Sequence, residues 1–513
     1  MTFPSSLQSL TFHSLLALIL GLGSWSPAGA AEPQQRIIAT FENSENINLQ
    51  GYRAQFRRVA SGSGHQLQIT TEGDADYPSV EIKANDGPWD LRGFHAVCAD
   101  VVNPQDHAVR VLLSVNNPGA NGRERCNVES VTVAGGGKAT LRVPFGVWHG
   151  EKGHDLDLAR IVSVSVLLDR PGRAHTFFVD NIRAIARDDN TFERLAKDAF
   201  FQEMTPELGR GINLGNMLDA PQEGAWGARL KAEYFPIIKN AGFDHVRLPV
   251  RWSAHAANDA PYTIDPEFLQ RVDWAVKNAL DNRLKIVVNM HHYDEIFDDP
   301  ASHAGRFVAL WRQISEHYAK APPDVYFELL NEPHNKLDAD RWNDLLAQTL
   351  AEVRKTNPRR KIIIGPTGWN SINELTALRL PPDDRNLIVT FHYYSPFRFT
   401  HQGASWVGGH SNQWLGTRWT GSEEELGELR SDLDRALAWA LANKRPLYLG
   451  EFGAYSKADM PSRARYTAAV AREAWKRRIS YAYWEFCAGF GAFDPERKQW
   501  RAPLRDALSP VGR

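Results

Sequence analysis

The chain of 513 residues contains little cysteine and no excess of charge of either sign. Its three cysteines are too few for a disulfide scaffold. Cys98 and Cys126 fall in the same N-terminal region and form either a disulfide or two buried thiols, and Cys487 is predicted to serve packing. The formal net charge of −2 argues against a nucleic-acid partner and against an anionic membrane surface.

Long apolar stretches are also lacking, with one exception at residues 14–25. That run is too short to span a bilayer, and Pro27-Ala28-Gly29-Ala30-Ala31 follows it with small residues suited to cleavage after Ala30. Residues 1–30 therefore resemble a secretory signal peptide, although residues 2–13 contain no Lys or Arg. We expect an exported protein, secreted or periplasmic, with no membrane-spanning segment in its mature form.

Residues 36–186 show short alternating strands separated by Gly, Pro and Asn, a pattern typical of an antiparallel β-sandwich. The first strand, near Phe41-Glu42, and the last, residues 177–182, resemble those of jelly-roll carbohydrate-binding modules. Such modules often hold a structural calcium where these strands meet, so Glu42 and Asp180 are candidate ligands, with a solvated surface as the alternative. Residues 187–204 are charged and compatible with helices, so this linker predicts docking against the region that follows.

From residue 205 to 513 apolar strands alternate with helices, which predicts a (β/α)₈ barrel. A doubly wound open sheet is the alternative, but no Gly-rich dinucleotide fingerprint follows the first strand. The helix beginning at Asp265-Pro266 is the best marked, with an N-cap Asp and a Pro at the first helical position. The eight predicted strands are residues 210–216, 245–250, 285–291, 325–331, 361–365, 387–394, 446–451 and 479–486.

Polar and aromatic residues recur at the predicted C-terminal strand ends, where a barrel of this kind carries its catalytic groups. Two of them, Glu332 and Glu451, are carboxylates delivered by different strands, as hydrolysis of a bond between sugars requires. The others are Asn216, Arg247, His291, His292, Asn331, Trp369, His392, Tyr394 and Trp484.

The motifs at these ends resemble glycoside hydrolase family 5 over about residues 204–505. The residues that carry the resemblance are Gly211-Ile212-Asn213-Leu214-Gly215-Asn216, Val246-Arg247-Leu248-Pro249, Met290-His291-His292-Tyr293, Leu330-Asn331-Glu332-Pro333, His392-Tyr393-Tyr394, Gly450-Glu451-Phe452-Gly453 and Tyr483-Trp484-Glu485-Phe486. The segment from Phe399 to Trp406 resembles the endoglucanase branch of the family.

The resemblance implies a retaining mechanism in which Glu332 is the general acid/base and Glu451 the nucleophile. It implies substrate-binding roles for the remaining residues. Arg247 and Tyr394 hold the nucleophile, Asn331 contacts the sugar 2-hydroxyl, Asn216 and the three histidines line the reacting site, and Trp484 forms its floor. Trp369 and Trp406 are loop aromatics suited to stacking on sugars, or they serve packing.

One assignment competes with this interpretation, and two neighbouring acids are given structural roles. A metal bound by His291, His292 and His392 is disfavoured because adjacent strand residues point to opposite faces. Glu328 lies four residues before Glu332, so it points into the barrel and is expected to pair structurally with Arg247 or a histidine. Glu485 is expected to point away from the side on which Trp484 lies.

We therefore predict a monomeric, secreted endo-β-1,4-glucanase that acts on β-glucan polysaccharide and needs no cofactor for catalysis. The alternatives within this scaffold are β-mannanase, licheninase and xyloglucanase. An exo-acting β-glucosidase is a less favoured alternative. A catalytically inactive glycan-binding protein is the alternative from another class.

Overall fold

A computed structural model describes residues 34–508 apart from 43–44, 46, 63 and 188–189. The predicted signal peptide, residues 1–30, lies outside the described residues and stays a prediction. Residues Pro33–Arg513 form one compact unit, so the predicted division into domains at residues 186 and 205 also stays a prediction. In the described part of the chain, no helix has both the length and the apolar character needed to cross a bilayer.

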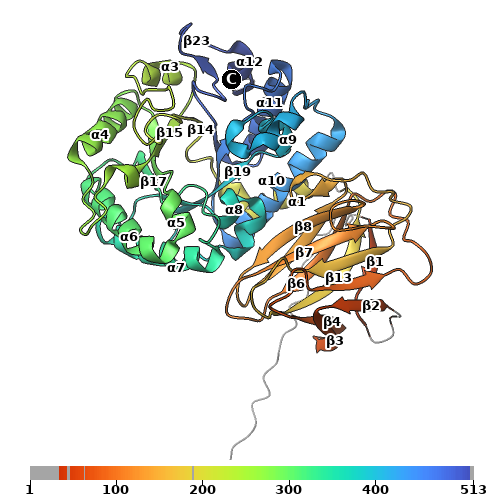
Figure 1. The fold of residues 1–513 in the computed structure, drawn as a ribbon. Helices are drawn as coiled ribbons and strands as arrows, with labels where there is room; N and C mark the ends of the chain where they lie inside the picture. The colour runs from red at the N-terminus through yellow and green to blue at the C-terminus, as the bar shows by residue number, and fades with distance from the viewer. Residues whose placement is uncertain (1–33, 43–44, 46, 63, 188–189, 509–513) are drawn as a thin grey trace, which may run out of the picture. The chain divides into compact units, whose positions relative to one another are not determined.

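Residues 35–185 form two stacked sheets, antiparallel except where β10 pairs with β8, as the alternating pattern predicts (Figure 1). Val109, Val111, Leu113 and Val115 alternate along β7 and belong to the buried core between the sheets. One sheet has the order β3-β4-β13-β6-β9 with β1 beside β13, and the other has the order β11-β10-β8-β7-β12-β5-β2. The strands are β1 Gln35–Ala39, β2 Asn48–Tyr52, β3 Ala54–Ser61, β4 Gly64–Thr71, β5 Ser79–Lys83, β6 Ala96–Val102, β7 Val109–Asn116, β8 Cys126–Val133, β9 Lys138–Pro144, β10 Val147–Trp148, β11 Glu151–Lys152, β12 Ser163–Leu167 and β13 Thr176–Ile185.

The sandwich contains two of the earlier candidate features, the cysteine pair and the calcium ligands. Cys98 and Cys126 are both buried free thiols, so the disulfide alternative is wrong in this structure. The Glu42 carboxylate accepts hydrogen bonds from the main chain and ring of His65, and Asp180 accepts one from the Asn181 N–H. A calcium ion needs six to eight oxygen ligands, so these two acids alone do not make a formed site, and calcium stays a prediction.

The connection to the barrel contains two short helices, α1 Thr191–Leu195 and α2 Ala199–Glu203. Phe201 and Met204 are buried with Leu437 and Leu441 of helix α10, Glu423–Asn443. Side chains also join the sandwich to the barrel directly: the Ala108 N–H donates to Asp340 at 2.8 Å, and the Thr376 hydroxyl donates to the Thr132 carbonyl at 2.9 Å. The helical linker is therefore packed against the barrel, as its composition predicts.

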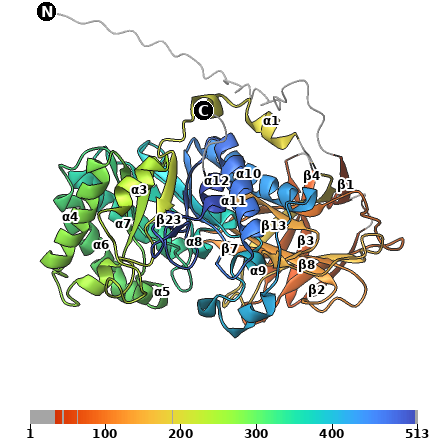
Figure 2. The ribbon, with the colours of Figure 1, turned by 90° about the horizontal axis from the view of Figure 1, so that it is seen from above.

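Residues 210–483 contain a closed barrel of eight parallel strands in sequence order, which confirms the predicted (β/α)₈ class. Figure 1 shows helices α3, α4, α6 and α7 around the outside of the strands, and Figure 2 shows α10 beside α11. The strands are β14 Arg210–Asn213, β15 His245–Val250, β16 Lys285–Met290, β17 Val325–Glu328, β18 Ile362–Ile364, β19 Leu387–Tyr393, β20 Leu447–Phe452 and β21 Ser480–Tyr483.

The covering helices follow the expected apolar pattern. In α4, Asp265 caps the N-terminus by accepting a hydrogen bond from the Glu267 N–H, and Val272, Ala275 and Ala279 are buried against the barrel core. The longer helices are α3 Tyr234–Asn240, α4 Pro266–Asp281, α6 Pro300–His317, α7 Ala339–Thr356, α10, α11 Met460–Lys476 and α12 Ala502–Leu508. Shorter elements in the loops are α5 Asp294–Asp298, α8 Thr367–Asn370 and α9 Phe397–Thr400, the 3₁₀ helices η1 Trp252–His255, η2 Ile372–Ala377, η3 Ser405–Val407 and η4 Gly409–Trp414, and the β22 Phe493–Asp494 and β23 Gln499–Trp500 hairpin.

Several strands end earlier than predicted, and this shifts site residues from strands into loops. Strand β17 ends at Glu328, so Asn331 and Glu332 lie past it, and β16 ends at Met290, before His291 and His292. Below these ends the barrel interior is filled by an apolar cluster of Leu208, Val287, Tyr326, Ile363, Ile388, Tyr448 and Ala482. The polar residues therefore lie on a packed floor at the C-terminal ends of the strands.

Candidate active site

Two carboxylates face each other above this floor. Glu451 belongs to β20 and is almost fully buried, whereas Glu332 follows β17 and is partly accessible. One oxygen of each lies within 4.8 Å of the other and of a ring nitrogen of His392. The backbone of Glu332 has a φ of 48°, a left-handed conformation that residues other than Gly adopt mainly where the surrounding structure holds them.

Glu451 is held in place by a cation and a phenol. Arg247 Nη1 donates to its Oε1 at 2.7 Å, and the Tyr394 hydroxyl donates to its Oε2 at 2.9 Å. Both donors favour the charged form of the carboxylate. The Glu451 side chain is thus fixed as an oriented anion.

Arg247 is fully buried, and each of its five N–H groups has an acceptor. Two of them bind Glu328 at 2.6 and 2.7 Å, one binds Glu451, and the remaining two bind the side-chain oxygens of Asn213 and Asn331 at 2.9 and 2.8 Å. The predicted structural pairing of Glu328 is therefore confirmed. Because Arg247 fixes the Asn331 oxygen, the amide N–H₂ group of Asn331 is left as a donor for a ligand.

Glu332 has a different environment, with a neutral histidine as its polar partner. Burial lowers the pKa of His392 to about 4, so the ring is uncharged near neutrality. Asn370 Nδ2 donates to His392 Nε2 at 3.2 Å, which leaves the ring proton on Nδ1, and Nδ1 lies 2.7 Å from Glu332 Oε1. Since Oε1 accepts from His392, a proton carried by Glu332 is on Oε2.

The pKa values of the two acids follow from these surroundings. Burial raises the pKa of Glu332 to about 7, opposed mainly by the positive charge of Arg247. Burial also raises the pKa of Glu451, but the neighbouring His392 and Arg247 act against that rise. Arg247 bonds directly to Glu451 and not to Glu332, so Glu451 is the acid that loses its proton first.

Aromatic rings form the walls beside the acids. Trp484 lies parallel to His291 with ring centroids 5.4 Å apart, and His292 contacts the exposed Trp226 edge to face at 5.4 Å. Trp369 is 55% exposed and Trp406 is 60% exposed, so both are available to a ligand. Trp406 contacts Tyr455, and Tyr455 contacts Phe490, which in turn contacts Tyr394. A chain of ring contacts therefore links Trp406 to the phenol that binds Glu451.

The geometric argument against a shared metal among the adjacent histidines is wrong. His291 and His292 lie beyond the end of β16, where strand alternation no longer applies, and one ring nitrogen of each lies within 4.8 Å of the other and of an Asp219 oxygen. The expectation that no metal binds there stays untested. Asp219 is itself committed to the main chain, because it accepts hydrogen bonds from the N–H groups of Asn216 and Met217.

Asn216 lies past β14 with a φ of 62°, in the turn that Asp219 holds. Glu485 is fully buried and accepts hydrogen bonds from the N–H groups of Cys487, Ala488 and Phe490, so it shapes the loop after β21. Sequence reasoning missed Asn213, Asp219, Asn370 and Trp226. Asn213 stands within the motif that ends at Asn216, and that motif could have marked it, whereas Asn370 follows Trp369 directly and has no pattern of its own.

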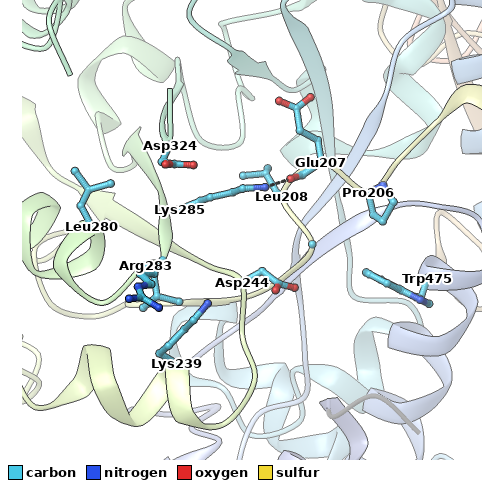
Figure 3. Close-up of a pocket in the computed structure, with 12 residues that line it drawn as sticks. Pro206, Glu207, Leu208, Lys239, Asp244, Leu280, Arg283, Lys285, Asp324 and Trp475 are labelled. Atoms are coloured by element: carbon cyan, nitrogen blue, oxygen red, sulfur yellow. Dashed lines mark hydrogen bonds between the residues drawn. The ribbon is translucent and has the colours of Figure 1, made fainter. Parts of the chain in front are cut away.

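A cavity of about 500 Å³ lies at the opposite end of the barrel, where the strands begin (Figure 3). Its lining includes Gly209, Asp244, Lys285 and Asp324, at or just before the first residues of β14 to β17. The Lys285 ammonium donates to the Glu207 carbonyl in this cavity. None of the predicted site residues lines it.

The chain is similar to known proteins of one family. The family model described as Cellulase (glycosyl hydrolase family 5) matches residues 208–489. Endoglucanase H of Acetivibrio thermocellus is 37% identical over 292 residues, which cover 57% of this chain and 31% of that protein, so the chain spans about a third of that relative.

Two solved structures resemble the barrel closely. A crystal structure of Thermotoga maritima Cel5A in complex with mannotriose is 49% identical, covers 60% of this chain and 99% of that chain, and has a TM-score of 0.58. The cellulose synthase subunit Z of Clostridioides difficile is 37% identical, covers 59% of this chain and 99% of that chain, and has a TM-score of 0.57. With a family match over more than half its length and a barrel that carries two acids at its strand ends, the chain belongs to glycosyl hydrolase family 5.

Proposed function

We propose that the protein is an endo-β-1,4-glucanase that cleaves internal bonds of β-glucan by double displacement. The observation that carries this proposal is the closeness of two carboxylates in unlike surroundings, with oxygens of Glu332 and Glu451 within 4.8 Å. Retaining glycosidases have carboxyl groups about 5–5.5 Å apart, whereas inverting enzymes keep them about 6.5–9.5 Å apart to admit a water molecule. The shorter separation supports the retaining route.

In the first step Glu451, charged and oriented by Arg247 and Tyr394, attacks the anomeric carbon and forms a glycosyl ester. Glu332 gives its Oε2 proton to the departing sugar oxygen at the same time. In the second step the ionised Glu332 takes a proton from water, which attacks the anomeric carbon, breaks the ester and releases Glu451. The Asn331 amide donates to the 2-hydroxyl, and Trp484 provides an apolar floor for the sugar.

Substrate choice rests on the relatives and on the exposed rings. The similar proteins include endoglucanases, and Cel5A of Thermotoga maritima was solved with cellobiose as well as mannotriose. Trp226, Trp369 and Trp406 are exposed tryptophans suited to stacking along an extended chain of sugars. β-Mannan is the second candidate because of the mannotriose complex. We further propose that the protein is exported and acts as a monomer.

The test is a panel of carboxymethylcellulose, lichenan, glucomannan and xyloglucan, followed by release of reducing ends. We expect the highest kcat/KM on a β-1,4-glucan, and NMR of cellopentaose hydrolysis should show the β-anomer released first. Release of the α-anomer first would contradict double displacement. No new reducing ends from any of the four would favour an inactive glycan-binding protein.

The pH dependence of kcat/KM follows from the protonation states that Glu332 and Glu451 need for catalysis. Glu332 must carry a proton, and its pKa of about 7 makes the rate fall as the pH rises through about 7. Glu451 must be ionised, and its raised pKa places the acidic fall above the ordinary range of Glu. A bell-shaped profile measured on cellopentaose, lost on its alkaline side in Glu332→Gln, is the expected result. A rate that stays flat from pH 6 to 9 would contradict the assignment of Glu332 as the acid.

A further inference from the structure

His334, two residues after Glu332, contacts both the acid and an exposed ring. Its Nδ1 lies 2.6 Å from the Glu332 carbonyl oxygen. A carbonyl oxygen only accepts, so Nδ1 carries the proton and donates. The ring of His334 is also stacked on Trp369, with centroids 4.8 Å apart and planes 17° apart, and its centroid lies 4.1 Å from that of the buried Phe297.

The two residues that His334 contacts, Glu332 and Trp369, both have unusual backbone conformations. Glu332 has a φ of 48° and Trp369 a φ of 59°, and such conformations persist only where the surroundings hold them. The Trp369 N–H donates to the Pro333 carbonyl at 3.3 Å, a second link between the same two segments. Three contacts therefore hold the acid and Trp369 in one arrangement: a hydrogen bond to Glu332, a ring stack on Trp369 and a main-chain bond between the segments.

We propose that His334 is a positioning residue for cleavage: it fixes the backbone of the acid and holds Trp369 as the stacking surface for the sugar that leaves. This inference rests on the proposed function. Glu332 protonates the leaving oxygen, so a ring fixed to the residues that follow Glu332 lies on the leaving-group side. The hydrogen bond sets where the acid proton is delivered, and the stack sets where the leaving sugar lies.

The two contacts can be removed separately. His334→Phe keeps a ring for the stack on Trp369 and loses the donor to Glu332, whereas His334→Asn keeps a short donor and loses the ring. His334→Ala loses both. His317→Ala is the matched control, because His317 pairs with Asp273 at the surface and makes no contact with Glu332 or Trp369.

The readout compares kcat/KM on cellopentaose with that on 2,4-dinitrophenyl β-cellobioside, whose leaving group departs without a proton. We expect His334→Ala to lose roughly 10- to 100-fold on cellopentaose, the scale of a misplaced catalytic group, and only about twofold on the dinitrophenyl substrate. His334→Phe should mainly lower kcat on cellopentaose, and His334→Asn should mainly raise KM. His317→Ala should match the wild type on both substrates.

An equal loss on both substrates in His334→Phe and His334→Asn, with unchanged thermal unfolding, would show a general structural role and overturn the inference. No loss in any variant would overturn it as well. Wild-type protein that fails to cleave cellopentaose would overturn the proposed function itself. Failure of the inference alone is therefore distinguishable from failure of the function.

Discussion

Glu451→Gln is expected to lower kcat on β-1,4-glucan by roughly five orders of magnitude, the scale on which loss of a covalent nucleophile lowers turnover. The amide keeps the shape of the side chain, its oxygen can accept from Arg247 Nη1 and its N–H₂ group can donate to the Tyr394 hydroxyl oxygen, but it cannot form the glycosyl ester. Release of reducing ends over long incubations measures the residual rate. Activity above about one per cent of wild type would contradict the assignment, given that scale.

A covalent trap gives the same prediction an independent readout. Mass spectrometry of wild-type protein incubated with a 2-deoxy-2-fluoro cellobioside should show one added 2-deoxy-2-fluorocellobiosyl group, a disaccharide, on the peptide that contains Glu451, and Glu451→Gln should show none. Glu424→Gln is the matched control, because Glu424 is exposed in the first turn of α10. Labelling of another carboxylate in the wild type would reassign the nucleophile.

Glu332→Ala is expected to lower kcat/KM on cellopentaose by about 10²–10⁴-fold, the usual contribution of a general acid. The same change should leave the first step on 2,4-dinitrophenyl β-cellobioside much less affected, because that leaving group needs no proton. Added azide should restore turnover of the dinitrophenyl substrate and give a β-glycosyl azide, since azide attacks the ester without a general base. Similar losses on the two substrates, with no response to azide, would contradict the acid/base role.

The sequence was sufficient to predict the barrel and the side chains of regular strands that point into its interior. Glu328 and Glu332 are four residues apart, and alternation alone predicted a structural partner for Glu328, which the structure shows to be Arg247. The prediction succeeded because the residues of β17 follow regular strand geometry up to Glu328.

The same reasoning failed where the backbone leaves regular geometry. His291 and His292 lie past β16, so alternation gave the wrong relation between their rings. Asn370, which itself has a φ of 57°, hydrogen-bonds to His392. Asp219 accepts a hydrogen bond from the N–H group of Asn216 in a tight turn. Contacts of this kind depend on loop conformations that strand alternation does not predict.

The five hydrogen bonds of Arg247 have a consequence for the intermediate of the proposed reaction. When Glu451 becomes an ester it gives up its negative charge, and a buried guanidinium with no other anion nearby would then be left uncompensated, at a cost of several kcal/mol. Arg247 bonds Glu328 through two of its N–H groups, so the cation keeps a permanent counter-ion while Glu451 is esterified. Glu328 takes no part in bond making, yet it lets one buried cation serve both the charged and the uncharged state of its neighbour.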